Sequence, residues 1–386
     1  MKVPLLDLKL QYQAIKNEID SAVLQVIESQ NFILGSEVEQ LESSIAKYVN
    51  AKFAIGVSSG TDALLIALMA MDVKPGDEII VPTFSFFATA GVVARLNAIP
   101  VFVDVDETTF TISPIEIEKK ITSRTRGIIP VHLFGQSAEM NSILEIAKKY
   151  NLFVIEDAAQ AIGTEYKNGN RIGSIGDIGC FSFFPSKNLG CFGDGGIVST
   201  NNEQLAEKLK ILRVHGSQPK YYHKLIGGNF RIDAIQSAVL NVKLKYLDNW
   251  TLKRNQNAEL YNNLFLKSGI AKFSGKPSNE FPISLPESIY QENGKPHFHI
   301  YNQYNLRVSN RNELKSYLLK NEIGCEIYYP VPFHKQECFK DFINKADLFP
   351  ISDSLASDSL AIPIFPELTE SQIEFVVTKI IEFYKQ

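Results

Sequence analysis

The chain has 386 residues, of which 45% are hydrophobic and 21% are charged, and its formal net charge is −4. This hydrophobic content is enough for a large core, and the length favours about two or three domains. Because the chain is mildly acidic and has no long basic run, nucleic acid is not expected as its main partner. No membrane association or signal peptide is expected either, since no apolar run reaches the roughly 18 residues of a membrane span.

The spacing of the four cysteines contains neither a CxxC pair nor a zinc-binding pattern. They are Cys180, Cys191, Cys325 and Cys338. We therefore expect reduced thiols, no metal site and a cytoplasmic location.

Apolar runs and helical patterns alternate through the first half of the chain. A short arm precedes a helix within residues 1–30, and Ser36 with Glu39 predicts a capping box at the start of a second helix. Buried strands are predicted at Phe53–Val57, Glu78–Pro82, Val101–Asp104, Gly127–Val131, Leu152–Asp157 and Ile197–Thr200. Strands that alternate with helices favour an α/β fold with a mostly parallel sheet flanked by helices.

A smaller second domain is predicted for the last third of the chain. A long amphipathic helix at Ile232–Leu247 ends the first domain, so we place the large domain at residues 1–248 and a small α+β domain at residues 249–386. Within the small domain we expect an irregular loop, then a strand and two helices. Their ranges are 269–297, Ile300–Val308, Arg311–Asn321 and Glu370–Tyr384.

A turn of small polar residues, Ser58–Asp62, follows the first predicted strand and opens a helix. Free backbone N–H groups and the positive end of the helix dipole make such a turn a candidate phosphate site. It is not a Walker A motif, because no Gly-Lys-Ser/Thr follows. An ordinary helix N-cap is the alternative.

The strand Leu152–Asp157 is apolar until it ends in two carboxylates, Glu156 and Asp157. Ligands of open α/β sheets bind at the carboxyl ends of the strands. A carboxylate in that place can pair with a protonated pyridine nitrogen. The alternative is an acid that caps the following helix.

A single lysine, Lys187, stands in the stretch Cys180–Gly196 among phenylalanines and glycines. Aromatic neighbours desolvate an ammonium group and lower its pKa, and the neutral amine that results can form a Schiff base. A solvated lysine in a glycine-rich turn is the alternative that the residues alone leave open.

The order Ser182-Phe-Phe-Pro-Ser-Lys187-Asn-Leu-Gly190, followed by Gly193–Gly196, resembles the Schiff-base loop of fold-type I enzymes that use pyridoxal 5′-phosphate (PLP). More narrowly, the chain resembles the DegT/DnrJ/EryC1/StrS family of sugar aminotransferases, from Val3–Leu8 to Ala361–Pro366. The resemblance implies the fold-type I architecture, with a large PLP-binding domain and a smaller C-terminal domain.

Roles for the cofactor-binding residues follow from this resemblance. Lys187 would form the Schiff base and Asp157 would pair with the pyridine nitrogen. Gly60 and Thr61 would hold the phosphate together with Ser182.

The resemblance also assigns a ring-stacking aromatic, a partner for the ring hydroxyl and a residue contributed by a second subunit. The stacking aromatic would be Phe86, with Phe84 and Phe87 as rivals for that place. Gln160 would lie by the ring hydroxyl. Asn229 would reach the phosphate of a partner subunit, which implies a homodimer with composite active sites.

Further residues are candidates for substrate contact. They are Ser59, His132, Tyr221, Tyr329 and His334. The segment Tyr328–His334 resembles the family's YPxPLH turn, with Phe333 in place of the usual leucine. An isolated histidine such as His132 more often has a structural role.

The resemblance implies transfer of an amino group from L-glutamate to a keto group of a nucleotide-linked sugar. Among family members, glutamine at the position of Gln160 tends to accompany amination at C-3, and histidine amination at C-4. A neutral amide cannot take up a proton as imidazole can. We expect a UDP-linked 3-keto-N-acetylhexosamine or uronate and a product for surface polysaccharide or lipopolysaccharide.

Several alternatives remain. The substrate could be a dTDP-linked 3-keto-6-deoxyhexose, or amination could occur at C-4. Family members that remove a hydroxyl group replace the lysine with histidine, so Lys187 argues against a PLP dehydratase. The intact Lys187, Asp157 and Ser182 argue against a PLP-fold sensor or scaffold without turnover.

Overall fold

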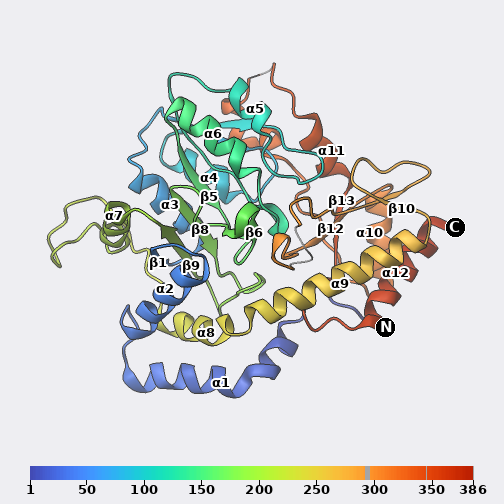
Figure 1. Cartoon of the computed structure of the whole chain (residues 1–386), viewed down its shortest axis with the longest axis horizontal. Coiled ribbons are helices and arrows are strands. Elements are labelled where there is room, and N and C mark those ends of the chain that lie inside the picture. Colours follow the sequence, from blue (N-terminus) through green and yellow to red (C-terminus); the bar gives the residue numbers. More distant parts are fainter. Residues whose placement is uncertain (292–295, 345, 386) are drawn as a thin grey trace.

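The computed structural model describes residues 1–291, 296–344 and 346–385 of the chain. A seven-stranded sheet lies in the larger part and a four-stranded sheet in the smaller part (Figure 1). The large sheet has the strand order β1-β9-β8-β5-β4-β2-β3. Its strands are β1 (Phe53–Val57), β2 (Glu78–Pro82), β3 (Ile99–Val103), β4 (Thr125–Ile128), β5 (Phe153–Asp157), β8 (Ile178–Ser182) and β9 (Gly196–Thr200). β9 is antiparallel to both of its neighbours and the remaining pairs are parallel, which confirms the predicted mostly parallel sheet.

Both faces of the large sheet are covered. Alternate residues of a strand point to opposite faces, and along β2 the side chain of Ile80 packs into one core while Ile79 and Val81 pack into the other. In β5, Val154 packs into the same core as Ile80, and Ile155 packs into the core of Ile79 and Val81. Burial on both faces explains why these strands are nearly continuous apolar runs in the sequence.

Helices of the large part flank this sheet, whereas α1 (Leu8–Ser29) packs against α8 (Ala234–Leu244) at the outer edge (Figure 1). The flanking helices are α2 (Ser36–Tyr48), α3 (Gly60–Ala70), α4 (Ala88–Arg95), α5 (Pro114–Lys119), α6 (Met140–Tyr150) and α7 (Glu203–Arg213). The predicted capping box was wrong. The N-cap of α2 is Gly35, without a side-chain capping bond, and Ser36 already belongs to the helix. Gly35 has φ = 85°, a left-handed turn that glycine makes without strain and that leaves no place for a serine cap.

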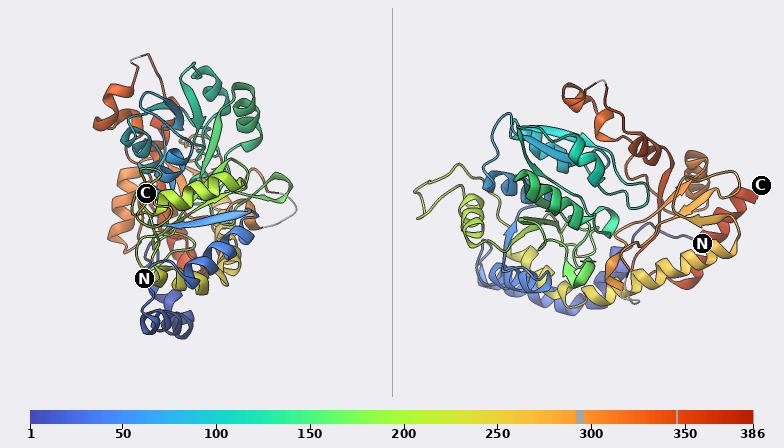
Figure 2. Two further views of the ribbon diagram at one scale, coloured as in Figure 1. Left: turned by 90° about the vertical axis from the view of Figure 1, so that its left-hand side faces the viewer. Right: turned by 45° about the horizontal axis from the view of Figure 1, so that its top comes forward.

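The helix expected at Ile232–Leu247 is two helices, α8 (Ala234–Leu244) and α9 (Leu247–Lys267). α9 runs from the side of the large sheet to the small sheet (Figures 1 and 2). The predicted division at residue 248 therefore falls inside a helix, and it stays a prediction. Val3 of the arm, which we placed with the large domain, forms a bridge to Ile323 in the smaller part.

The small sheet has the strand order β10-β11-β12-β13, and helices pack against it. Its elements are β10 (Ala271–Phe273), β11 (Ile283–Leu285), β12 (Tyr304–Val308), β13 (Ser359–Ile362), α10 (Arg311–Lys320), α11 (Pro350–Asp358) and α12 (Glu370–Lys385). A small hairpin of β6 (Glu165–Tyr166) and β7 (Asn170–Arg171) lies apart from both sheets. Within the described residues, no helix is both long and apolar enough to span a bilayer.

Two predictions for the small part need correction. The irregular loop expected at 269–297 contains β10 and β11, and its residues 292–295 lie outside the described residues. The strand expected from Ile300 begins only at Tyr304. The preceding backbone is instead held by residues 134 and 135, through hydrogen bonds from Ile300 N to Gly135 O (3.0 Å) and from Asn302 N to Phe134 O (2.9 Å).

Glu156 anchors the turn that leads from β5 towards β8. Its fully buried carboxylate accepts hydrogen bonds from the backbone N–H groups of Gly173 (2.8 Å), Ile175 (2.8 Å) and Gly176 (2.7 Å). It also accepts one from His132 Nε2 (3.1 Å), because His132 Nδ1 is occupied as an acceptor for Ala138 N–H (3.0 Å).

We expect Glu156→Gln to destabilise the protein. The substituted amide places an NH2 group against backbone donors, and buried donors without an acceptor cost about 1–3 kcal/mol each, so a loss of about 2–4 kcal/mol is expected. Thermal unfolding would measure it. The control is Glu145→Gln on the exposed side of α6, and equal melting temperatures for the two variants would contradict the assignment.

Candidate functional site

A cavity of about 470 Å³ lies at the carboxyl ends of β5 and β8, beside the start of α3. Most of the predicted site residues line it: Ser59, Gly60, Thr61, Phe86, Asp157, Gln160, Ser182, Lys187 and Tyr329. β5 and β8 are adjacent and parallel, with Asp157 opposite Cys180. Their ends therefore bring the aspartate and the lysine loop to the same place, as expected for an open α/β sheet.

Lys187 is carried by a tight loop between β8 and β9. Its backbone N–H donates to Phe184 O (2.8 Å), and Cys191 N closes the loop on Phe183 O (2.8 Å). Burial lowers the pKa of the Lys187 amine to about 8, although the negative charge of Asp157 acts against this shift. A substantial fraction of the amine is therefore neutral and nucleophilic near physiological pH.

Asp157 is held in a fixed orientation at the end of β5. It is 4% exposed, and its Oδ2 accepts a hydrogen bond from Thr89 Oγ1 (2.7 Å) on α4. Its Oδ1 accepts one from Ala159 N (3.2 Å). Burial raises the pKa of the Asp157 carboxyl, and the bond from Thr89 and the charge of Lys187 oppose this rise. A cation placed beside this carboxylate would be strongly favoured.

The start of α3 forms an anion cradle against the end of β8. The first N–H groups of a helix have no partner within it, and at α3 these belong to Gly60 and Thr61. A Cβ atom at Gly60 would lie 2.6 Å from the Cβ of Ser182, so glycine alone permits this close approach. Ser59 Oγ is used as the N-cap and accepts from Asp62 N (3.0 Å). Unpaired N–H groups, the helix dipole and a nearby hydroxyl suit a phosphate.

The three candidate aromatics have different surroundings. Phe86 is 57% exposed and lines the cavity, with its ring centroid 6.3 Å from that of Tyr329. Phe84 is fully buried in a core cluster. Phe87 stacks on Phe339 with ring centroids 5.4 Å apart. Of the three, Phe86 is the one whose ring faces the cavity.

Gln160 is fixed by two hydrogen bonds. Its Oε1 accepts from Phe134 N (2.7 Å), and its Nε2 donates to the hydroxyl of Tyr329 (3.1 Å). The amide therefore presents a defined donor–acceptor pattern at one wall of the cavity.

Four predicted residues do not line this chain's cavity. His132 is fully buried against Glu156. His334 bonds through its ring to Thr83 Oγ1 (2.9 Å) and Asp353 Oδ1 (3.0 Å). Tyr221 and Asn229 lie in the exposed loop between α7 and α8, which stands off the body of the molecule (Figure 1).

Sequence reasoning missed several residues that build the site. Thr89 orients Asp157, and Asn188 ties the lysine loop to Ile300 O through its Nδ2 (3.0 Å). Gln303 and Tyr328 line the cavity. The Tyr-Tyr pair of the Tyr328–His334 turn was a signal for Tyr328, whereas nothing local marked Gln303.

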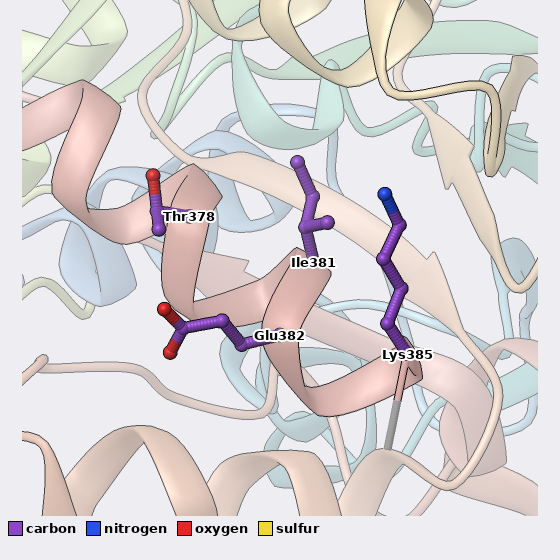
Figure 3. Close-up of a pocket in the computed structure, with 4 residues that line it drawn as sticks. All are labelled: Thr378, Ile381, Glu382 and Lys385. Carbon is purple, nitrogen blue, oxygen red and sulfur yellow. The ribbon is translucent and has the colours of Figure 1, made fainter.

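A second hollow lies on the surface of α12, lined by Thr378, Ile381, Glu382 and Lys385 (Figure 3). All four side chains come from one helix, and among the described residues no polar group from another element lines this hollow. We do not consider it a candidate active site.

The residues of the main cavity fit PLP. The nucleophilic amine of Lys187 suits its aldehyde, Asp157 suits a protonated ring nitrogen, and the cradle at Gly60 and Thr61 suits its phosphate. Phe86 offers an aromatic face for the ring.

Comparison with known proteins agrees with this fit. The model of the DegT/DnrJ/EryC1/StrS aminotransferase family matches residues 13–381. The chain is 46% identical to a pleiotropic regulatory protein of Geobacillus stearothermophilus, over 100% of this chain and 99% of the relative. It is 40% identical to the UDP-N-acetyl-3-dehydro-alpha-D-glucosamine 3-aminotransferase of Acidithiobacillus ferrooxidans, and the match covers 98% of this chain and 97% of the relative. It is 39% identical to the dTDP-3-amino-3,4,6-trideoxy-alpha-D-glucose transaminase of Streptomyces venezuelae, and the match covers 99% of this chain and 96% of the relative.

A solved structure gives the same result for the fold. The crystal structure of DesV from S. venezuelae, in complex with a ketimine intermediate, superposes with a TM-score of 0.91 at 38% identity. The match covers 100% of this chain and 99% of that one. The predicted fold is thus confirmed.

We expect Asp157→Asn to lower the rate of amino transfer about a hundredfold or more, the scale of losing a strong charge-stabilising contact. Thr89→Val keeps the carboxylate but removes its orienting bond, so a smaller loss of about tenfold is expected. Single-turnover rates with L-glutamate would measure both, and bound PLP would be quantified to separate rate from retention. An effect below about threefold for Asp157→Asn would show that the carboxylate is merely structural.

Proposed function

The chain belongs to the DegT/DnrJ/EryC1/StrS aminotransferase family, and we propose that it transfers an amino group from L-glutamate to C-3 of a nucleotide-linked keto sugar. It is a PLP-dependent sugar aminotransferase, as its family and its relatives are. The observation that carries the proposal is the shared cavity of Lys187 and Asp157 beside the anion cradle of α3.

The chain's own residues would perform distinct tasks in this reaction. PLP, when bound, supplies an electron sink for chemistry at the amine-bearing carbon. Lys187 would hold the cofactor covalently and would carry a proton, a role that a pKa of about 8 suits. Asp157 holds the charge of the ring nitrogen, and the backbone of Gly60 and Thr61 binds the phosphate together with Ser182.

Position C-3 is supported by two relatives and by one residue. The names of the A. ferrooxidans and S. venezuelae relatives both refer to carbon 3 of their sugars. The residue is Gln160, since family members with glutamine at this position tend to aminate C-3 and those with histidine C-4; unlike an imidazole, the amide cannot take up a proton. We further propose a UDP-linked 3-keto-N-acetylhexosamine or uronate as substrate, with a dTDP-linked 3-keto-6-deoxyhexose as the alternative. The product would be a 3-amino sugar for a surface polysaccharide or lipopolysaccharide.

Substrate assignment can be tested with a panel of keto-sugar nucleotides, each incubated with PLP-loaded enzyme and L-glutamate. We expect NMR of the product to place nitrogen at C-3 of a UDP sugar. Lys187→Ala serves as the inactive variant, and Lys74→Ala, an exposed lysine, as the matched control. Nitrogen at C-4 would refute the position, and exclusive use of dTDP sugars would refute the carrier.

A regulatory role without turnover is the second candidate, because one relative is named a regulatory protein. The visible absorbance of the PLP-loaded protein distinguishes the two. An aminotransferase loses this absorbance when L-glutamate is added, and a sensor without turnover keeps it.

We also propose that the enzyme is a homodimer with shared active sites. Among the described residues that line the cavity, the charged side chains are Lys187, Asp157 and Asp194, although phosphate, glutamate and a nucleotide are all anions. Cations from elsewhere would balance these ligands. The loop between α7 and α8 offers them in Lys220 and Lys224, and both side chains are exposed.

Asn229→Ala should weaken PLP retention without lowering the melting temperature of the cofactor-free protein, because Asn229 is exposed in the single chain. Dialysis followed by absorbance measures retention, and light scattering measures the mass in solution. An active monomer with full retention would contradict the shared site.

A further inference from the structure

A second buried lysine lies beneath the loop that carries Lys187. Lys243 belongs to α8 and is 2% exposed. Its Nζ donates a hydrogen bond to Gly190 O (2.6 Å) and lies 4.7 Å from the centroid of the Phe192 ring. No ion pair is recorded for it within the described part of the chain. The mechanism proposed above does not use this residue.

Burying an unpaired ammonium is unfavourable. Burial lowers the pKa of Lys243 to about 8, which reflects the cost of keeping it charged there. An apolar side chain of similar length, such as methionine, would fill the same space without that cost. The gain must therefore come from what the ammonium contacts, which is the carbonyl oxygen of Gly190 together with the ring of Phe192 two residues further along the same loop.

Gly190 is where the lysine loop closes. A Cβ atom at this position would lie 2.3 Å from Pro185 O, so the two sides of the loop meet there without space for a side chain. The next residue, Cys191, bonds back to Phe183 O through its N–H (2.8 Å) and its Sγ (2.9 Å). A donor that fixes Gly190 O therefore fixes the closed end of the loop, and with it the backbone that presents Lys187.

We propose that Lys243 is a positioning residue that holds the Lys187 loop in its reactive shape through the carbonyl of Gly190. This rests on the proposed role of Lys187 as the residue that carries the cofactor. A hydrogen bond from a charged donor is stronger and more directional than a neutral one. The stronger hydrogen bond to Gly190 O explains why position 243 carries a lysine, although an apolar side chain would pack there equally well.

The test compares Lys243→Met with Asn241→Leu. Asn241 lies on the same helix, but its Nδ2 donates to Glu37 O on α2 and not to the lysine loop. PLP is added to cofactor-free protein, the product is reduced with borohydride at timed intervals, and labelled Lys187 is quantified by mass spectrometry. This readout needs no sugar substrate and no turnover.

We expect the rate of attachment at Lys187 to fall about tenfold in Lys243→Met, the scale of one hydrogen bond to a charged group. Its melting temperature without cofactor should stay close to that of the wild type, because the loss of the buried charge offsets the loss of the donor to Gly190 O. Asn241→Leu should keep the attachment rate. Attachment within twofold of wild type in Lys243→Met would overturn the proposal, and so would a fall in melting temperature that accounts for the slower attachment.

The proposed function is tested separately on the wild-type enzyme, through the loss of absorbance with L-glutamate. A wild type that binds PLP at Lys187 but does not respond to glutamate would refute the aminotransferase reaction. The role of Lys243 would still be decided by the attachment rates.

Discussion

The cavity depends on two opposite charges, the buried Asp157 at the end of β5 and the half-buried Lys187 in the loop that follows β8. Burial raises the pKa of Asp157 and lowers that of Lys187, so each group is pushed towards its neutral form. Their mutual attraction opposes both shifts but does not cancel them. The result is an amine that is partly free to react and a carboxylate that would be stabilised by a cationic ring. Desolvation of the two groups therefore produces both the nucleophilic amine and the carboxylate that would pair with the ring nitrogen.

Two consecutive residues at the end of β5, Glu156 and Asp157, link the site to the stability of the sheet. Glu156 and Asp157 are consecutive in β5, and side chains of consecutive strand residues point to opposite faces. Glu156 accepts the backbone N–H groups of the turn at residues 173–176, which leads into β8. Asp157 faces the cavity that β8 and its loop complete. The carboxylate that holds the two strands together and the carboxylate that serves the site are thus placed by the same strand end.

The sequence predicted those features that local patterns encode. Apolar runs gave the strands of the large sheet except β8, and the family resemblance of the segments around Lys187 and Asp157 pointed to the two main site residues. Features that depend on distant partners were missed. His132, for example, is a partner of Glu156, 24 residues away. The capping box at Ser36 failed for a local reason, since Gly35 makes the turn. Asn188 and Ile300 are bonded although 112 residues apart, and no local pattern reports such a contact. That Phe86 lines the cavity, whereas Phe87 packs on Phe339, likewise depends on contacts that no local pattern reports.

The loop between α7 and α8 shows a form that fits its proposed role in a second subunit. It stands off the body, yet it is braced internally by hydrogen bonds from His215 N to Gly228 O (2.9 Å) and from Lys224 N to Gly216 O (2.8 Å). Gly216 has φ = 75°, and a Cβ there would lie 1.7 Å from Leu225 O, so the bracing requires glycine. A preformed loop loses little conformational entropy on docking. Its tip exposes large side chains, among them Tyr221, Tyr222 and Ile226, and an exposed apolar patch of this kind favours association. The loop between α7 and α8 therefore combines a braced backbone, exposed apolar side chains and the lysines Lys220 and Lys224. These are the properties that a segment needs if it is to bring positive charge to the anionic ligands in the cavity of a partner subunit.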